Sequence, residues 1–137
     1  MQTVITYLAI IFGAMLMSAQ NTVEVHISNL SSNDGNVKVG LYNSAATFLE
    51  KQYKGAVILI ENKKASVTFS EIPDGVYAVS FYHDEDEDNE FDMIMGMIPK
   101  EDYGCSNNAK GMFGPPKFED AKFELTNGMI KKVDISL

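Results

Sequence analysis

The sequence predicts an all-β protein, a seven-stranded antiparallel β-sandwich with a long loop between the fifth and sixth strands. Three observations predict this fold class. Apolar and polar residues alternate with a period of two through most of the chain after residue 20, which is typical of half-buried strands. Groups of Asn, Asp, Gly and Pro separate these runs at short intervals and indicate turns. The stretch 84–117 has little periodicity and several Gly and Pro residues, which indicates a long loop of the functional or disordered kind.

Seven runs carry the strand pattern, at residues 23–28, 37–42, 57–60, 65–69, 76–82, 118–125 and 129–137. The turn signal Asn33-Asp34-Gly35-Asn36 predicts that the first two strands form a hairpin, and Asn127-Gly128 predicts the same for the last two. Between the second and third strands, Ser44 is placed to cap a short helical turn. Ile72-Pro73-Asp74-Gly75 predicts a turn before the fifth strand, which is rich in Val, Tyr and Phe.

The first 19 residues predict a signal peptide. Residues 4–17 are nearly all apolar, and Met17-Ser18-Ala19 supplies the small residues of a cleavage site. The apolar run is shorter than the roughly 20 residues of a membrane-spanning helix. No Lys or Arg precedes Lys38, which departs from the usual basic start, so a retained anchor and a buried helix are the alternatives. We expect one domain over residues 20–137, exported to the periplasm, the extracellular space or the cell surface, without stable membrane insertion after cleavage.

The chain is acidic, with 19 Asp and Glu against 11 Lys and Arg and a net charge of −8. This charge argues against binding to nucleic acid or to anionic lipid headgroups, and it is compatible with cations, basic partners or solubility alone. The single cysteine, Cys105, excludes a disulfide within the chain. We interpret it as a small buried hydrophobe, with intermolecular pairing or metal binding as alternatives. We expect a monomer.

The acidic run 84–92 holds seven carboxylates among nine residues and no Lys or Arg. So many like charges favour either full solvation or a bound cation. The spacing matches a calcium loop, which takes side-chain ligands at positions 1, 3 and 5, a backbone carbonyl at position 7 and often a water-mediated ligand at position 9. We therefore predict a Ca²⁺ site formed by Asp84, Asp86, Asp88, Glu90 (through its main chain) and Asp92.

Two positions depart from an EF-hand. Position 6 is Asn89 where Gly is usual, and position 12 is Met95 where a bidentate Glu is required, so an ordinary EF-hand is excluded. A final ligand would have to come from elsewhere, and the candidates are Glu101, Asp102, Glu119 and Asp120. Glu85 and Glu87 fall between the ligand positions and are expected to face solvent. The alternative is a solvated acidic loop that binds ions only diffusely.

His83 directly precedes the acidic run. It is a candidate ligand or general base beside Asp84, although we favour a role in orienting the loop by hydrogen bonding. A hydrolase that uses His83 and a loop carboxylate is therefore one alternative function. The sequence has no nucleophile elbow, phosphate loop, zinc motif or dinucleotide fingerprint, so a non-enzymatic role is favoured. His26 falls on the polar face of the first strand and is expected at the surface.

The alternating Met93, Met95 and Met97 suggest a second alternative, a periplasmic copper-binding protein. In an extended segment the three thioethers would line one face, and such soft ligands select Cu(I). His83, Cys105 and Met112 are candidates to complete that site. The competing interpretation is a strand that packs its Met face into the core.

A third group of residues suggests a binding groove. The aromatic side chains of Tyr82, Tyr103 and Phe113, with the amides of Asn107 and Asn108, suit a sugar or peptide ligand. The competing interpretation is that the Asn side chains satisfy backbone groups of the loop.

Residues 22–137 resemble the bacterial family of small exported proteins known as domain of unknown function 2141. The resemblance is carried by GNVKVGLY (35–42), IPDGVYAV (72–79), YHD (82–84), GMIPKEDYG (96–104), SNNAKG (106–111) and FGPPKFEDA (113–121). It implies an exported β-sandwich of the transthyretin-like or immunoglobulin-like kind, and no established activity. Family members similarly place a His-Asp pair before an Asp/Asn-rich loop, with Asn-Gly where this chain has Asp88-Asn89. The missing Gly weakens the match to a tight calcium turn, and the additional carboxylates partly offset this.

From these observations we expect an exported, non-enzymatic binding or accessory domain with a calcium-stabilised acidic loop. Its partner is expected to be a ligand or protein of the cell envelope.

Overall fold

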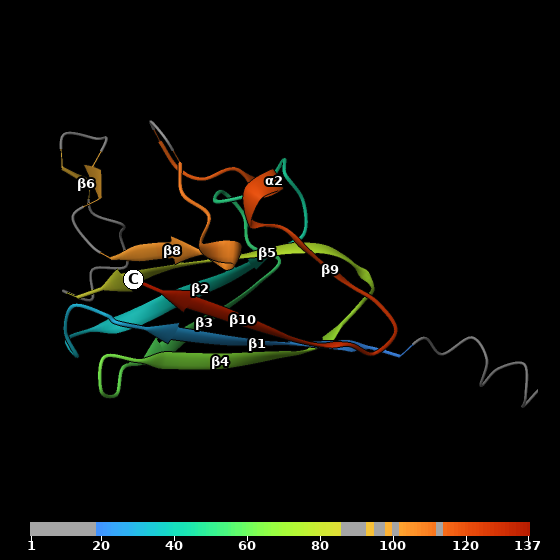
Figure 1. Ribbon diagram of the computed structural model, residues 1–137, viewed down its shortest axis with the longest axis horizontal. Coiled ribbons are helices and arrows are strands. Elements are labelled where there is room, and N and C mark those ends of the chain that lie inside the picture. Colours follow the sequence, from blue (N-terminus) through green and yellow to red (C-terminus); the bar gives the residue numbers. More distant parts are fainter. Residues whose placement is uncertain (1–18, 86–92, 95–97, 100–101, 112–113) are drawn as a thin grey trace, which may run out of the picture.

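The computed structural model describes residues 19–85, 93–94, 98–99, 102–111 and 114–137 (Figure 1). The protein is all-β, and the described part of the chain forms eight strands in two sheets: β1 (Asn21–Ser28), β2 (Asn36–Tyr42), β3 (Lys54–Leu59), β4 (Ala65–Ile72), β5 (Gly75–Asp84), β8 (Tyr103–Cys105), β9 (Phe123–Leu125) and β10 (Ile130–Ser136). Two short strands, β6 (Met93–Ile94) and β7 (Ile98–Pro99), pair with each other. Helix is limited, in these residues, to the 3-10 turn η1 (Ser106–Asn108) and the four-residue α2 (Phe118–Ala121).

The first sheet has the strand order β10-β1-β4. Its central strand, β1, alternates buried and less buried residues along its length, as the sequence predicted. β1 runs antiparallel to β4 but parallel to β10, with Val25 opposite Val133 and Ile27 opposite Ile135. The prediction of a wholly antiparallel arrangement was therefore wrong. Alternation fixes which face of a strand is buried and leaves the direction of its neighbour open.

The second sheet has the order β3-β2-β5-β8, and β9 pairs with the beginning of β5. Its longest strand, β5, lies between β2 and β8 and runs antiparallel to both. The sequence placed residues 103–105 in the long loop, whereas they form β8, a strand too short to show a period. It placed residues 118–121 in a strand, whereas they form α2, which packs with Ala78 and Cys105.

Both predicted hairpins were wrong, because each turn joins strands of different sheets. After β1 the chain crosses to the second sheet, with Leu30 buried and its backbone N–H bonded to the Lys63 carbonyl at 3.1 Å. The Asn127-Gly128 turn forms with φ of 56° and 70°, but it leads from β9 to β10. The Asn-Gly pair therefore predicted the turn correctly, but the strands on either side of it do not pair with each other. Ser44 Oγ accepts from Thr47 N–H at 3.3 Å, as predicted for a cap, although residues 45–50 form turns and not a helix.

One hydrophobic core contains side chains from both sheets. The first sheet contributes Val23, Val25, Ile27, Phe69, Val133 and Ile135, and the second contributes Val37, Val39, Leu41, Tyr77, Val79, Phe81 and Leu125. A smaller cluster around Cys105 lies beneath α2. The predicted signal peptide falls almost wholly outside the described residues, and within those residues no helix has the length and apolar character to cross a membrane.

Candidate functional site

The candidate site begins at the end of β5, where a histidine continues a row of core residues. Tyr77, Val79, Phe81 and His83 alternate along β5 and are all buried, because side chains two residues apart share a face of a strand. His83 is the last of this row and is 0% exposed. The imidazole is therefore held at the rim of the core, beside the start of the acidic run.

Both backbone and ring of His83 are fixed by neighbours distant in sequence. Its backbone N–H donates to the Asp102 carbonyl at 2.7 Å, and ring Nε2 lies 2.5 Å from the Asp34 carbonyl oxygen. A carbonyl only accepts, so Nε2 carries the hydrogen of this bond. The second ring nitrogen, Nδ1, is buried and has no hydrogen-bond partner among the described residues. The predicted role of His83 as a hydrogen-bonding residue is consistent with these contacts.

Two carboxylates face the free nitrogen of His83. Nδ1 lies 3.6 Å from Glu85 Oε1 and 3.8 Å from Asp102 Oδ2, and the side chains are 43% and 27% exposed. Asp102 is held in place by Ser31, whose N–H and Oγ both donate to Oδ2, at 2.9 and 2.5 Å. We call His83, Glu85 and Asp102 the loop-base cluster. Their ligand atoms lie within 4.8 Å of one another, which is the arrangement of a possible metal site.

The turn that supplies the Asp34 carbonyl depends on a close backbone approach. Gly35 has a φ of +70°, and a Cβ built on it would lie 2.0 Å from the carbonyl oxygen of Asp84. A residue without a side chain is therefore needed where the turn crosses the end of β5. The ladder between β2 and β5 places Asn36 opposite Asp84 and Val37 opposite His83.

The comparison with protein families matches residues 25–132 to a family described as an uncharacterised protein conserved in bacteria, DUF2141. The chain belongs to the DUF2141 family. The resemblance stated from the sequence is thereby confirmed. No curated protein and no solved structure matches the chain.

The predicted calcium ligands of this DUF2141 protein are described only at one end. Asp84 closes β5 and is fully buried. Asp86, Asp88, Glu90 and Asp92 lie outside the described residues, so that prediction stays a prediction. Sequence reasoning named Asp102 only as one possible extra ligand and assigned Glu85 to solvent. The residues around Glu85 and Asp102 do not indicate that the two lie beside His83, because this cluster forms only when the chain entering β8 returns beside β5.

The predicted binding groove is brought together only in part. Tyr82 and Tyr103 are cross-strand partners on β5 and β8, so their side chains share one face of the second sheet. Asn107 Nδ2 donates to the carbonyls of Asp120 and Lys122, at 3.2 and 2.9 Å, and Asn108 Oδ1 accepts from Ser136 N–H at 3.3 Å. These amides therefore hold backbone groups, as the competing interpretation expected. Phe113 lies outside the described residues.

The methionines of the copper alternative are described only in part. Met93 lies in β6, whereas Met95, Met97 and Met112 lie outside the described residues. Cys105 is a free, buried thiol, in agreement with its interpretation as a small hydrophobe.

We expect the Cys105 thiol to resist modification while the protein is folded. Burial raises its pKa, and a hydrogen bond with Ser80 opposes that rise in part. A thiol-specific reagent at pH 8 should therefore react with less than roughly a tenth of native protein in the time that it fully modifies protein in guanidinium. Since the unfolded thiol ionises at a lower pH than the folded one, its contribution to stability should fall as pH rises above about 8.5. Equal rates in native and unfolded protein would contradict this account.

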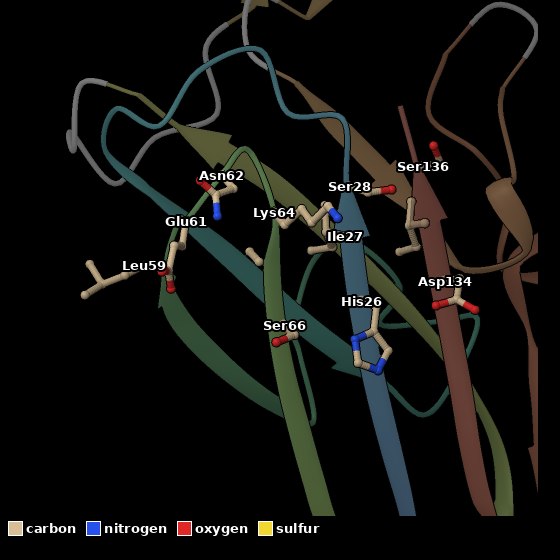
Figure 2. Close-up of a pocket in the computed structure, with 12 residues that line it drawn as sticks. His26, Ile27, Ser28, Leu59, Glu61, Asn62, Lys64, Ser66, Asp134 and Ser136 are labelled. Carbon is tan, nitrogen blue, oxygen red and sulfur yellow. The ribbon is translucent and has the colours of Figure 1, made fainter.

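A second candidate is an open depression on the outer face of the first sheet (Figure 2). Figure 2 shows His26, Ser66 and Asp134 on adjacent strands, and the ladders place them in one row across β4, β1 and β10. His26 is exposed, as predicted. None of the hydrogen bonds of the described residues joins these three side chains, so the row lacks the contacts of a catalytic triad. The loop-base cluster, with its buried and unpartnered nitrogen, is the stronger candidate.

Proposed function

We propose that this DUF2141 protein is an exported, non-enzymatic binding or accessory domain whose acidic segment is ordered by a bound cation, with Ca²⁺ as the leading candidate. One observation carries the proposal. Glu85, directly after β5, and Asp102, directly before β8, both approach His83 Nδ1, at 3.6 and 3.8 Å. The two ends of the stretch 85–102, which contains most of the acidic run, therefore meet at one histidine nitrogen.

Charge repulsion supports a role for a cation in this segment. Residues 84–92 carry seven carboxylates in sequence, and the return of the chain brings Asp102 to the same His83 nitrogen that Glu85 approaches. Like charges gathered so closely repel one another, and a divalent cation with several oxygen ligands relieves that repulsion. In the proposal Asp84, Asp86, Asp88, Glu90 (through its carbonyl) and Asp92 bind the Ca²⁺. The ordered loop then presents a surface to a ligand or protein partner.

The location and the finer fold class also belong to the proposal. Residues 1–19 act as a signal peptide, and the domain over 20–137 works in the periplasm or at the cell surface. The two sheets form a β-sandwich of the transthyretin-like or immunoglobulin-like kind, and the protein acts as a monomer. Such domains often carry their binding loops at one end of the sheets. The proposed calcium ligands begin at Asp84, the last residue of β5.

We expect Ca²⁺ to raise the unfolding temperature of the protein above its value in EDTA. At a hundredfold excess over the dissociation constant, binding to the folded state alone adds about 3 kcal/mol, or roughly 10 °C for a domain of this size. The Asp86→Ala variant should lose most of that rise, as measured by thermal unfolding with circular dichroism.

The matched control is Glu50→Ala, which removes one exposed carboxylate from the turn after Ser44. It should keep the full response to Ca²⁺. An unfolding temperature that does not change between EDTA and Ca²⁺ would refute the proposed cation role and leave the segment as solvated charge.

A further inference from the structure

We infer that the loop-base cluster is a separate centre for a divalent transition metal of the zinc class, with His83 Nδ1, Glu85 and Asp102 as its protein ligands. This inference goes beyond the calcium proposal, because it uses a nitrogen ligand and needs none of the residues 86–92. It rests on the buried imidazole and on the groups that orient it.

The first step is the state of the imidazole. Because Nε2 donates to the Asp34 carbonyl, a neutral His83 ring has its lone pair on Nδ1. That nitrogen is buried, without a hydrogen-bond partner, and faces two carboxylates. Its distances to them, 3.6 and 3.8 Å, exceed those of an N–H···O hydrogen bond. A lone pair and two anionic oxygens repel one another, and either a proton on Nδ1 or a metal ion bound between the three atoms relieves that repulsion.

The second step is the fit of the three ligand atoms to a metal. Zinc binds His nitrogen and carboxylate oxygen at about 2.0–2.2 Å, which separates neighbouring ligands of a tetrahedral ion by about 3.3–3.6 Å. The 3.6 Å between Nδ1 and Glu85 Oε1 matches this spacing. The 3.8 Å between Nδ1 and Asp102 Oδ2 is slightly larger, and a small shift of the ring or of the Asp102 carboxylate closes the difference. Three protein ligands leave a fourth position for water or for a group from a partner.

The third step is the choice of metal. Ca²⁺ takes oxygen ligands, whereas imidazole suits zinc and other first-row divalent ions. The surroundings also match those of metal-binding histidines, which commonly donate their other ring N–H to a carbonyl or carboxylate. Asp34 supplies that carbonyl, and Ser31 orients the Asp102 carboxylate through two hydrogen bonds. The bound ion would thus hold together the two ends of the stretch 85–102, since Glu85 and Asp102 are both ligands.

The test is Zn²⁺ titration of the full-length chain without a histidine tag, by calorimetry. We expect one Zn²⁺ per chain, and Ca²⁺ in hundredfold excess should not displace it. Loss of an outer partner weakens metal affinity by about 10–100-fold. Loss of the nitrogen ligand in His83→Gln, whose amide can still donate to Asp34, should therefore weaken Zn²⁺ binding at least about 100-fold. Glu85→Gln should weaken it at least about tenfold, and the control Glu50→Gln should have no effect.

Nitrogen NMR of the His83 ring supplies a direct readout, since Nδ1 should shift on addition of Zn²⁺ while Nε2 keeps its hydrogen. Circular dichroism of each variant checks the fold, and Glu85→Gln tests the inference even if His83→Gln does not fold. The inference is overturned if no saturable Zn²⁺ binding occurs, if Glu85→Gln binds like the unmodified chain, or if Nδ1 does not shift. Calcium displacement of Zn²⁺ at equal concentration would overturn the choice of metal. Asp86→Ala should keep Zn²⁺ binding, so this inference and the calcium proposal fail separately.

Discussion

Replacement of Gly35 by alanine should destabilise the protein by about 2–5 kcal/mol. Two effects add. The backbone at Gly35 has a φ of +70°, which costs a residue with a side chain about 1–2 kcal/mol. The new Cβ would also lie 2.0 Å from the Asp84 carbonyl oxygen and 2.8 Å from Glu85 Cα, so the turn or the end of β5 must move. Both contacts are with backbone, which has no rotamer to yield. Urea unfolding monitored by circular dichroism measures the loss.

The matched control for this change is Gly114→Ala. A Cβ at Gly114 would meet no atom of the described residues within 4 Å, so the free energy of unfolding of this variant should stay within about 0.5 kcal/mol of the parent value. Equal effects of the two substitutions would contradict the close approach at Gly35. Gly35→Ala should also weaken Zn²⁺ binding, because movement of the turn carries the Asp34 carbonyl away from His83.

Replacement of Phe81 by alanine should cost about 3–5 kcal/mol, a large share of the 5–15 kcal/mol that stabilises a typical domain. Phe81 is 1% exposed and lies two residues before His83 on the same face of β5. A Cβ built on its cross-strand partner Gly104 would lie 2.7 Å from the Phe81 ring and 2.9 Å from Ile135 Cγ2. The ring is therefore close to a residue of the other sheet, and its removal leaves a cavity between the sheets.

Val76→Ala is the comparison for Phe81→Ala. Val76 is on the same strand but 44% exposed, so its truncation should cost less than about 1 kcal/mol. A Phe81→Ala protein that unfolds at the same urea concentration as the parent would show that the interior had repacked around the missing ring.

The sequence predicted the properties that depend on single strands. Alternation identified the buried faces of β1, β2 and β5, and Ser44 marked a turn through its own hydroxyl. Pairing was not predictable in the same way, because a strand such as β1 shows the same pattern whether its neighbour is β2, β4 or β10. The turn before β2 was read correctly as a reversal of the chain. Nothing in its residues shows that the reversal also changes sheets.

The part of the candidate site that could be predicted is the part whose residues are adjacent in sequence. His83 and Asp84 are adjacent in sequence, and the acidic run begins there, so this region stood out. Ser31 and Asp102 come from segments 71 residues apart, and their contact exists only because the β1–β2 connection and the chain entering β8 meet beyond the end of β5. The unpartnered state of Nδ1 is a property of three-dimensional burial, which no spacing of residues encodes.

The parallel pairing of β1 with β10 has a consequence for how the chain folds. Asn21–Ser28 pairs with Ile130–Ser136, so neighbouring strands are separated by about a hundred residues of sequence. Contacts of such high contact order form late, because the entropy of closing a long loop opposes them. During synthesis, β1 emerges first and must wait for β10 with one edge unpaired. Removal of only the last strand should therefore leave the first sheet incomplete and expose an aggregation-prone edge of β1.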